Sequence, residues 1–231
     1  MTITLITGAN KGLGLETARH LSELGHTVYL GARDPQRGQA AADSVNARFV
    51  QLDVTDDASV DAAVAVIRQQ EGHLDVLVNN AGIASPHASP EDTTAETMEA
   101  IYATNVFGIV RVTHAMLPLL EASDSPVVVN VSSGLGSFGR VTDPTALEST
   151  FPTIAYGSSK AAVSALTLQY SKAFPALRVN AVDPGYTATD LNANAGTQSI
   201  QEGTEAIIRL ATIDADGPTG TFSDRLGNVP W

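Results

Sequence analysis

The chain has 231 residues, which is enough for one α/β domain with a large buried core. Hydrophobic residues make up 43% of it and charged residues only 16%, a balance that excludes an intrinsically disordered protein. The net charge of −12 argues against a surface for nucleic acid or an anionic membrane, and the absence of cysteine excludes disulfides, thiolate metal sites and cysteine catalysis.

Short apolar runs alternate with longer amphipathic segments along the whole chain. Nearly continuous β-branched runs predict strands at 2–7, 27–32, 48–53, 75–80, 127–133 and 177–183. Apolar residues at helical spacing predict helices at 12–24, 35–46, 56–70, 95–120 and 155–173. This alternation predicts a single Rossmann-type domain over residues 1–231, a doubly wound parallel sheet with helices on both faces.

Two further features narrow the class of protein. The apolar start "MTITLITGAN" lacks the basic region of a secretory signal, and no apolar stretch approaches membrane-spanning length, so we expect a cytoplasmic protein. The histidines show no metal-ligand spacing, so we expect no metal site. They are His20, His26, His73, His87 and His114.

A glycine-rich turn follows the first predicted strand. In "TGANKGLGLETARHL", Gly8, Gly12 and Gly14 permit a tight strand-to-helix turn and a close approach of the backbone to a pyrophosphate. Three glycines can also form an ordinary loop. Their place between a strand and an amphipathic helix favours a dinucleotide site, and the absence of a following G-K-[ST] excludes a P-loop.

The end of the second predicted strand bears on which dinucleotide would bind. An acidic residue here binds a ribose 2′-hydroxyl, whereas arginine accommodates a 2′-phosphate. Arg33 precedes Asp34 in "LGARDPQRG", Arg37 follows, and Lys11 lies in the glycine-rich turn. We expect these cations to converge, which favours NADP(H) over NAD(H). The alternative is that both arginines are solvated charges and that Asp34 binds the ribose.

Tyr156 and Lys160 stand four positions apart in "TIAYGSSKAAVSALT", so they share one face of the predicted helix. Both residue types also face water readily, so plain surface residues are the alternative. The ordinary pKa of a phenol is about 10, and a neighbouring ammonium favours the phenolate, so we expect Lys160 to lower the pKa of Tyr156. The phenol could then exchange a proton with a substrate oxygen.

The motifs together resemble those of the short-chain dehydrogenases/reductases, and within them the carbonyl-reductase-like members. The resemblance runs almost end to end and includes "TGANKGLG", "LDVLVNNAG" at 74–82, "TNVFG" at 104–108, "VNVSS" at 129–133, "YGSSK" at 156–160 and "VDPGYTATD" at 182–190. It implies a catalytic tetrad of Asn105, Ser133, Tyr156 and Lys160. Tyr156 would be the general acid/base, and Ser133 would donate a hydrogen bond to the substrate oxygen.

The resemblance also implies contacts to the cofactor. Asp53 and Val54 would contact the adenine, Lys160 the nicotinamide ribose and Thr187 the carboxamide. With the residues named above, the expected cofactor-binding set is Gly8, Asn10, Lys11, Gly12, Leu13, Gly14, Arg33, Arg37, Asp53, Val54, Asn79, Ala81, Gly82, Tyr156, Lys160, Pro184, Gly185 and Thr187. Asn105 would hold a water that relays to Lys160, cap an irregularity in its helix, or do both.

The segment 134–154, between Ser133 and Tyr156, is longer than in compact members of that family. We expect it to be a loop insert that forms part of the substrate pocket. Phe138, Leu147 and Phe151 would contact substrate there or pack against the body. Because the insert is of intermediate length, a homo-oligomer and a monomer both stay open.

The sequence therefore predicts an NADP(H)-dependent oxidoreductase that interconverts carbonyl compounds (aldehydes, ketones and quinones) and alcohols. Its partners would be small molecules, not nucleic acids or membranes. The alternative is a non-catalytic NADP(H)-binding sensor or scaffold, which would have no need to keep Tyr156 together with Lys160.

Overall fold

The fold is built on one mixed sheet, as seen in a computed structural model that describes residues 1–84 and 90–231. Within these ranges the sheet has eight strands in the order β3-β2-β1-β4-β5-β6-β7-β8, and all neighbours are parallel except β7 and β8. The strands are β1 (Ile3–Ile6), β2 (Thr27–Ala32), β3 (Arg48–Gln51), β4 (Val76–Asn79), β5 (Val127–Val131), β6 (Arg178–Val182), β7 (Phe222–Asp224) and β8 (Gly227–Asn228). The predicted Rossmann-type doubly wound sheet is confirmed.

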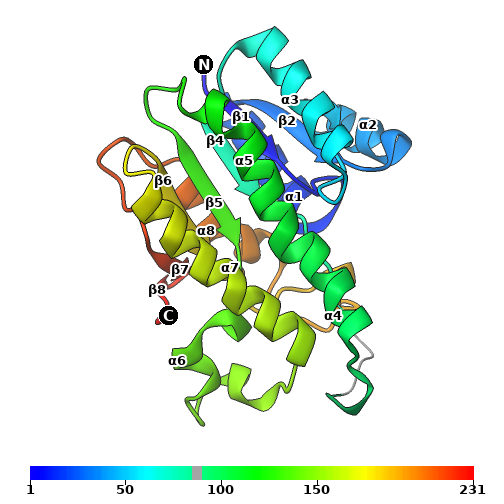
Figure 1. The fold of residues 1–231 in the computed structure, drawn as a ribbon, viewed down its shortest axis with the longest axis vertical. Coiled ribbons are helices and arrows are strands. Elements are labelled where there is room, and N and C mark those ends of the chain that lie inside the picture. The colour runs from blue at the N-terminus through cyan, green and yellow to red at the C-terminus, as the bar shows by residue number, and fades with distance from the viewer. Residues whose placement is uncertain (85–89) are drawn as a thin grey trace.

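Helices cover both faces of this sheet (Figure 1). The helices are α1 (Gly12–Glu23), α2 (Pro35–Ser44), α3 (Asp57–Glu71), α4 (Ala95–Tyr102), α5 (Gly108–Leu120), α6 (Phe138–Val141), α7 (Ile154–Ala173) and α8 (Ile200–Ala211). Apolar residues of α1, α2 and α8 form the core on one face. Residues of α3, α5 and α7 form the core on the other.

Side chains that point alternately to the two faces of the sheet explain why the strand sequences are continuously apolar. Leu5 of β1 points into the core under α3 and α5, whereas its neighbour Ile6 points into the core under α1 and α8. Leu77 and Val78 of β4 divide in the same way. Because both faces are covered, every position along a central strand is buried, which is the pattern of a parallel sheet.

The structure differs from the sequence prediction in three places. The predicted helix 95–120 is interrupted by a π-helical turn, η2 (Ala103–Phe107), between α4 and α5. The segment 134–154 is not a plain loop, because it holds α6 and the 3₁₀ turns η3 (Gly134–Gly136) and η4 (Leu147–Thr150). Beyond residue 183 the prediction contained no element, whereas the structure has α8, β7 and β8.

The expectation that no stretch approaches membrane-spanning length is also wrong. Ala95–Leu120 is long and apolar enough to cross a bilayer by length and composition alone. Half of its most apolar window is buried inside the fold, where Val112 and Met116 of α5 belong to the core. A core helix that packs on a sheet meets the same criterion.

Candidate active site

The strand order reverses between β1, which lies next to β2, and β4, so a cleft is expected outside the carboxyl ends of these strands. Helix α1 starts there at Gly12, directly after the glycine-rich turn. Its N-cap residue Lys11 makes no side-chain capping bond, and its first turn holds no acidic residue. The amide groups of the first turn are therefore available to a negatively charged phosphate.

The geometry of the turn fits a dinucleotide phosphate. Gly8 has φ +62°, and a Cβ there would lie 2.8 Å from the Cα of Ala81, so no larger residue is tolerated. Gly12 has φ +56°, and the nearest atom to a Cβ there is the methyl of Thr189 at 3.8 Å. A Cβ at Gly12 would therefore make only an ordinary contact with Thr189, and it is the positive φ that favours glycine here.

The two asparagines that end β4 point in opposite directions. Asn79 is 3% exposed, and its amide donates to Thr113 Oγ1 (3.2 Å) and Asn130 Oδ1 (2.9 Å), inside the fold. Its side chain therefore faces away from the cleft, unlike what the sequence suggested. Asn80 was missed, although it stands in the same motif: its amide donates to the carbonyls of Thr7 (2.8 Å) and Gly8 (3.1 Å) and fixes the glycine-rich turn.

The charged residues expected to select the cofactor differ in their roles: Asp34 caps a helix, whereas Arg33 is exposed near Asp53. Asp34 Oδ1 accepts the backbone N–H of Arg37 (2.9 Å) as the N-cap of α2, so this acid has a structural task. Arg33 is exposed and lies close enough to Asp53 for its charge to act there. Burial raises the pKa of Asp53, but hydrogen bonds from Thr55 and the charge of Arg33 outweigh burial and hold it below its ordinary value.

Lys11 does not join that group. Its ammonium pairs with Asp190 Oδ2 at 2.9 Å, and both side chains are about two-thirds exposed. Val54 also has little free surface, because its side chain lies in the core against Gly108. Arg37 Nε in turn lies 3.7 Å from Asp34 Oδ2, so Lys11 and Arg37 each pair with a different acid and do not converge with Arg33.

The carboxamide end of the expected cofactor site follows β6. Leu13, Pro184, Gly185 and Thr187 line one cavity, and Thr187 Oγ1 donates to the carbonyl of Pro184 (2.8 Å). Asn10 is half-buried in the glycine-rich turn. Residues 81–82 lie opposite, and the Ala81 N–H donates to Thr7 Oγ1 (2.9 Å). A Cβ at Gly82 would lie 3.6 Å from Lys160 Nζ, so this backbone passes beside the lysine.

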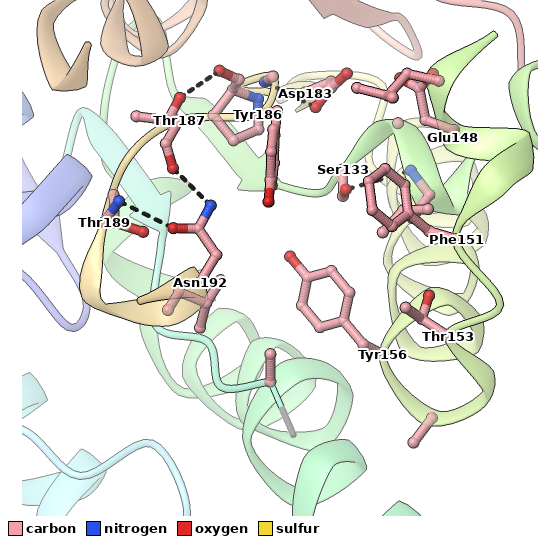
Figure 2. A pocket seen from close by; sticks show the side chains of 18 of the residues that line it. Ser133, Glu148, Phe151, Thr153, Tyr156, Asp183, Tyr186, Thr187, Thr189 and Asn192 are labelled. Atoms are coloured by element: carbon pink, nitrogen blue, oxygen red, sulfur yellow. Dashed lines mark hydrogen bonds between the residues drawn. The ribbon is translucent and has the colours of Figure 1, made fainter. Parts of the chain in front are cut away.

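Helix α7 carries Tyr156 in its first turn and Lys160 in the next. The hydroxyl of Tyr156 points into the cavity, across from Ser133, which directly follows the end of β5 (Figure 2). Lys160 is 4% exposed and donates to the carbonyl of Val131 (2.7 Å). Its Nζ lies 5.6 Å from the centre of the Tyr156 ring. The fold thus brings together three of the four residues expected in the tetrad.

The pKa values of this pair contradict part of the expectation. Burial raises the pKa of Tyr156 well above 10, the charge of Asp183 raises it further, and a hydrogen bond with Ser133 opposes both. Burial lowers the pKa of Lys160 to about 8, against the charge of Asp183. Lys160 is therefore not what sets the proton affinity of Tyr156 in the protein alone. The loss of water around Tyr156 and Lys160 on burial is the largest cause of both pKa shifts.

Asn105, the fourth expected residue, lies in the π-turn and is fully buried. Its Oδ1 accepts the Ile83 N–H (2.8 Å), and its Nδ2 donates to the Ile83 carbonyl (2.9 Å) and to Ser159 Oγ (3.0 Å). A Cβ at Gly82 would lie 3.5 Å from Asn105 Oδ1, so Asn105 and Lys160 flank the same glycine. Asn105 thus joins the loop after β4 to α7, directly beside the lysine.

A cavity of about 490 Å³ opens beyond the carboxyl ends of β5 and β6. Leu147, Phe151 and Thr153 of the insert line it, together with Tyr186, whose ring lies 5.9 Å from that of Phe151. Phe138 is 70% exposed and is not among the lining residues. The insert lies at the end of the molecule beneath β5, as Figure 1 shows.

Sequence reasoning also missed Arg140, Glu148 and Asp183, which form a charged group beside this cavity. No spacing in the sequence brings them together, because they meet only when the insert folds onto the end of β6. Over residues 1–84 and 90–231, no group of His, Asp or Glu side chains could hold a metal ion. His87 lies outside the described residues.

Comparison with known proteins agrees with this geometry. The family model for short chain dehydrogenase matches residues 2–200. A salutaridine reductase from Papaver bracteatum is 32% identical, over 97% of this chain and 94% of its own. The structure of an NADPH-bound carbonyl reductase from chicken fatty liver matches over the whole of both chains with a TM-score of 0.88 and 28% identity.

A second solved structure holds a related cofactor. It is a gluconate 5-dehydrogenase from Burkholderia cenocepacia in complex with NADP and tartrate, which matches with a TM-score of 0.81 and 26% identity over 97% of this chain and 94% of that one. The resemblance read from the motifs is confirmed by the family match. The chain belongs to the short-chain dehydrogenase family of oxidoreductases.

Proposed function

We propose that this protein is an NADP(H)-dependent reductase of carbonyl compounds, with Tyr156 as its general acid/base. One observation carries the proposal. The Tyr156 hydroxyl points into a mainly apolar cavity, across from Ser133 and one helical turn from Lys160. An uncapped helix start that suits a nucleotide phosphate lies at the same end of the sheet.

The chemistry follows from the protonation states of these groups. The pKa of Tyr156 lies above 10, so at neutral pH the phenol keeps the proton that it would donate to a carbonyl oxygen. Ser133 would donate a second hydrogen bond to that oxygen and stabilise the negative charge that develops on it. The bound nicotinamide would supply the hydride. The reverse reaction needs the phenolate, so alcohol oxidation is expected to require a higher pH.

Lys160 and Asn105 would support this proton transfer. Because the pKa of Lys160 is about 8, its ammonium is mostly charged at neutral pH and can hold the hydroxyl groups of the nicotinamide ribose. Asn105 uses both N–H groups of its amide within the protein, whereas within residues 1–84 and 90–231 its Oδ1 accepts one bond, from the Ile83 N–H. That oxygen can accept a further bond from a water molecule beside Lys160.

The preference for NADP(H) rests on the different roles of two neighbouring residues at the end of β2, Asp34 and Arg33. Asp34, which could have bound a ribose 2′-hydroxyl, is the N-cap of α2. Arg33 is exposed beside Asp53 and is free to meet a 2′-phosphate. Two of the matched structures hold NADPH or NADP and a third is complexed with NADH, so the choice rests on Arg33 and Asp34.

The substrate would be a small aldehyde, ketone or quinone. Leu147, Phe151 and Tyr186 give the cavity an apolar and aromatic wall on the side of the insert. Such a wall binds a carbon skeleton without demanding one pattern of hydrogen bonds, so we expect broad specificity. We accordingly propose that residues 134–154 form part of the substrate pocket and that no macromolecular partner is needed for turnover.

The test is NADPH consumption with a panel of aldehydes, ketones and quinones. Tyr156→Phe is expected to lower kcat by about 10²-fold or more, because the proton donor is lost. Binding of NADPH, followed by its fluorescence, should persist. Tyr170→Phe is the matched control, since Tyr170 lies on the same helix but stacks on Phe174. Full activity of Tyr156→Phe would overturn the proposed role, and cofactor binding without turnover of any substrate would favour a sensor or scaffold.

A further inference from the structure

A partly buried charge network joins the insert to the catalytic end of the sheet. Arg140 of α6 donates to Asp183 Oδ2 (2.6 Å) and Glu148 Oε1 (3.1 Å) through one guanidinium nitrogen, and to Asp224 through another. Asp183 is 3% exposed. One positive charge is therefore shared among three carboxylates that come from the insert, the end of β6 and β7.

Asp183 is fixed against the backbone that carries the expected catalytic residues. Its Oδ1 accepts the Gly185 N–H (2.9 Å), and it also accepts a backbone bond from Gly134, the residue after Ser133. A Cβ at Gly134 would lie 2.9 Å from Asp183 Oδ2. Asp183 and Tyr156 line the same cavity (Figure 2). The carboxylate thus has a set position near the reacting phenol.

The negative charge of Asp183 determines the direction in which it shifts the pKa values of Tyr156 and Lys160. A negative charge beside Tyr156 opposes the phenolate, and beside Lys160 it favours the ammonium, so Asp183 holds the proton on both groups. Arg140 pairs with Asp183 and favours its ionised form, so it sustains this effect. Glu148 lies near enough to Asp183 to act on its ionisation, with a sign opposite to that of Arg140. Burial disfavours an ionised Asp183, and Arg140 offsets part of that cost.

We propose that Asp183 and Arg140 are positioning residues that set, through charge and not through contact, how firmly Tyr156 and Lys160 hold their protons. The consequence for catalysis rests on the proposed function. The effect on the protonation of Lys160 does not rest on the proposed function, because it is a property of the folded protein. Folding of the insert thus supplies the counter-charge that tunes the active site.

Lysine NMR measures this effect without turnover. The chain has three lysines, Lys11, Lys160 and Lys172, so protein labelled with ¹³C at lysine Cε gives few signals, and Lys160→Met assigns the one of interest. Asp183→Asn should lower the titration midpoint of Lys160 by about one pH unit, as expected for removal of a nearby charge. Arg140→Gln should also lower it, because Asp183 then loses the charge that favours its ionised form, and Arg140→Lys, which keeps the charge, should leave it nearly unchanged.

Asp224→Asn is the matched control. It removes a carboxylate from the same arginine, but unlike Arg140 it is not among the groups that act on Asp183. A purely structural role would lower the melting temperature of all four variants and would leave the Lys160 midpoint of Asp183→Asn and Arg140→Gln at its wild-type value. Should Arg140→Gln fail to fold, Asp183→Asn decides the question, because it keeps the size of the side chain.

The pH profile of turnover provides the second readout. In Asp183→Asn the pH at which alcohol oxidation rises should move down together with the Lys160 midpoint. An unchanged Lys160 midpoint in Asp183→Asn would overturn the proposal, whatever the kinetics show. If the wild-type protein turns over no substrate while the midpoints shift as expected, the proposed function fails and the charge coupling stands.

Discussion

At Lys160 the stability of the fold and the proposed chemistry have opposite requirements, because the chemistry needs an ammonium that burial disfavours. Its ammonium is buried, with a pKa of about 8 against 10.5 for an exposed lysine, and it donates to the carbonyl of Val131. In the folded state the charged form is therefore disfavoured. At neutral pH the protein has to bury that charge, which costs roughly 3 kcal/mol from the difference of the two pKa values.

Lys160→Met is expected to stabilise the protein at pH 7. Removal of the buried charge gains roughly 3 kcal/mol, and loss of the bond to Val131 costs about 1 kcal/mol, so the net gain is about 2 kcal/mol. The wild-type protein gains stability as the pH rises from about 8 toward 10.5, because the unfolded chain then binds more protons than the folded one. The advantage of the variant should disappear over that window.

Urea unfolding at several pH values between 7 and 10 measures this difference. Lys172→Met is the control, because Lys172 is exposed near the end of the same helix and its substitution should change little at any pH. A gap between Lys160→Met and the wild type that stays constant with pH would contradict the buried-charge account.

Individual residues were predictable where local spacing decides their place. Tyr156 and Lys160 share a helix, so the four-residue interval alone put them on one face, and the fold keeps them there. Asn79 was misplaced because alternation beyond the end of β4 turns neighbouring side chains in opposite directions, and it is Asn80 that reaches the turn. The lowered pKa of Lys160 depends on burial, which no short motif records.

At the scale of elements, the π-turn in the middle of 95–120 is the least predictable feature. Its five residues contain no glycine or proline that would signal a break. The extra residue in the turn is stabilised from outside, by the bonds that Asn105 makes to Ile83 and Ser159. Asparagine in the middle of a helix was the one local sign of it. By contrast, α8 has a capping box, Ser199 with Glu202, that the sequence reading overlooked.

Asn105→Ala tests the role of this element. It removes one buried and two partly buried hydrogen bonds and leaves the backbone of Ile83 without its partner, so we expect a loss of about 2–3 kcal/mol in the free energy of unfolding. Asn228→Ala, at an exposed position in β8, should change it by less than about 0.5 kcal/mol. Equal effects of the two substitutions would show that the π-turn does not depend on Asn105.

The kinetics of the same variant bear on the relay. Measured well below its melting temperature, Asn105→Ala should also lose kcat if Oδ1 holds a water beside Lys160. An unchanged kcat with lowered stability would assign Asn105 to the helix irregularity alone. The two alternatives that the sequence left open are thus separated by two measurements on one protein.

At the scale of the whole molecule, the class of sheet was predictable, because central strands that are buried on both faces have continuously apolar sequences. Strand and helix alternation with right-handed crossovers predicted the doubly wound parallel sheet, whereas the order β3-β2-β1-β4-β5-β6 comes from the structure. That topology sets the cleft at the reversal beside β1 and brings Ser133, Tyr156 and Thr187 from distant parts of the chain to one cavity. Residues 134–154 escaped prediction because their short turns are held by contacts such as Arg140 with Asp183, not by local propensity.

Cofactor choice is best tested through the stability of the whole molecule. A ligand that binds only the folded state at 100 times its Kd adds about 2.7 kcal/mol. For a protein of this size that raises the melting temperature by about 5–10 °C. Because the proposal has Arg33 meet only the extra phosphate of NADPH, Arg33→Ala should reduce the shift caused by NADPH and leave the shift caused by NADH nearly unchanged. Arg68→Ala, an exposed arginine of α3, is the control. Equal reductions with both cofactors would mean that Arg33 holds the site together and does not read the phosphate.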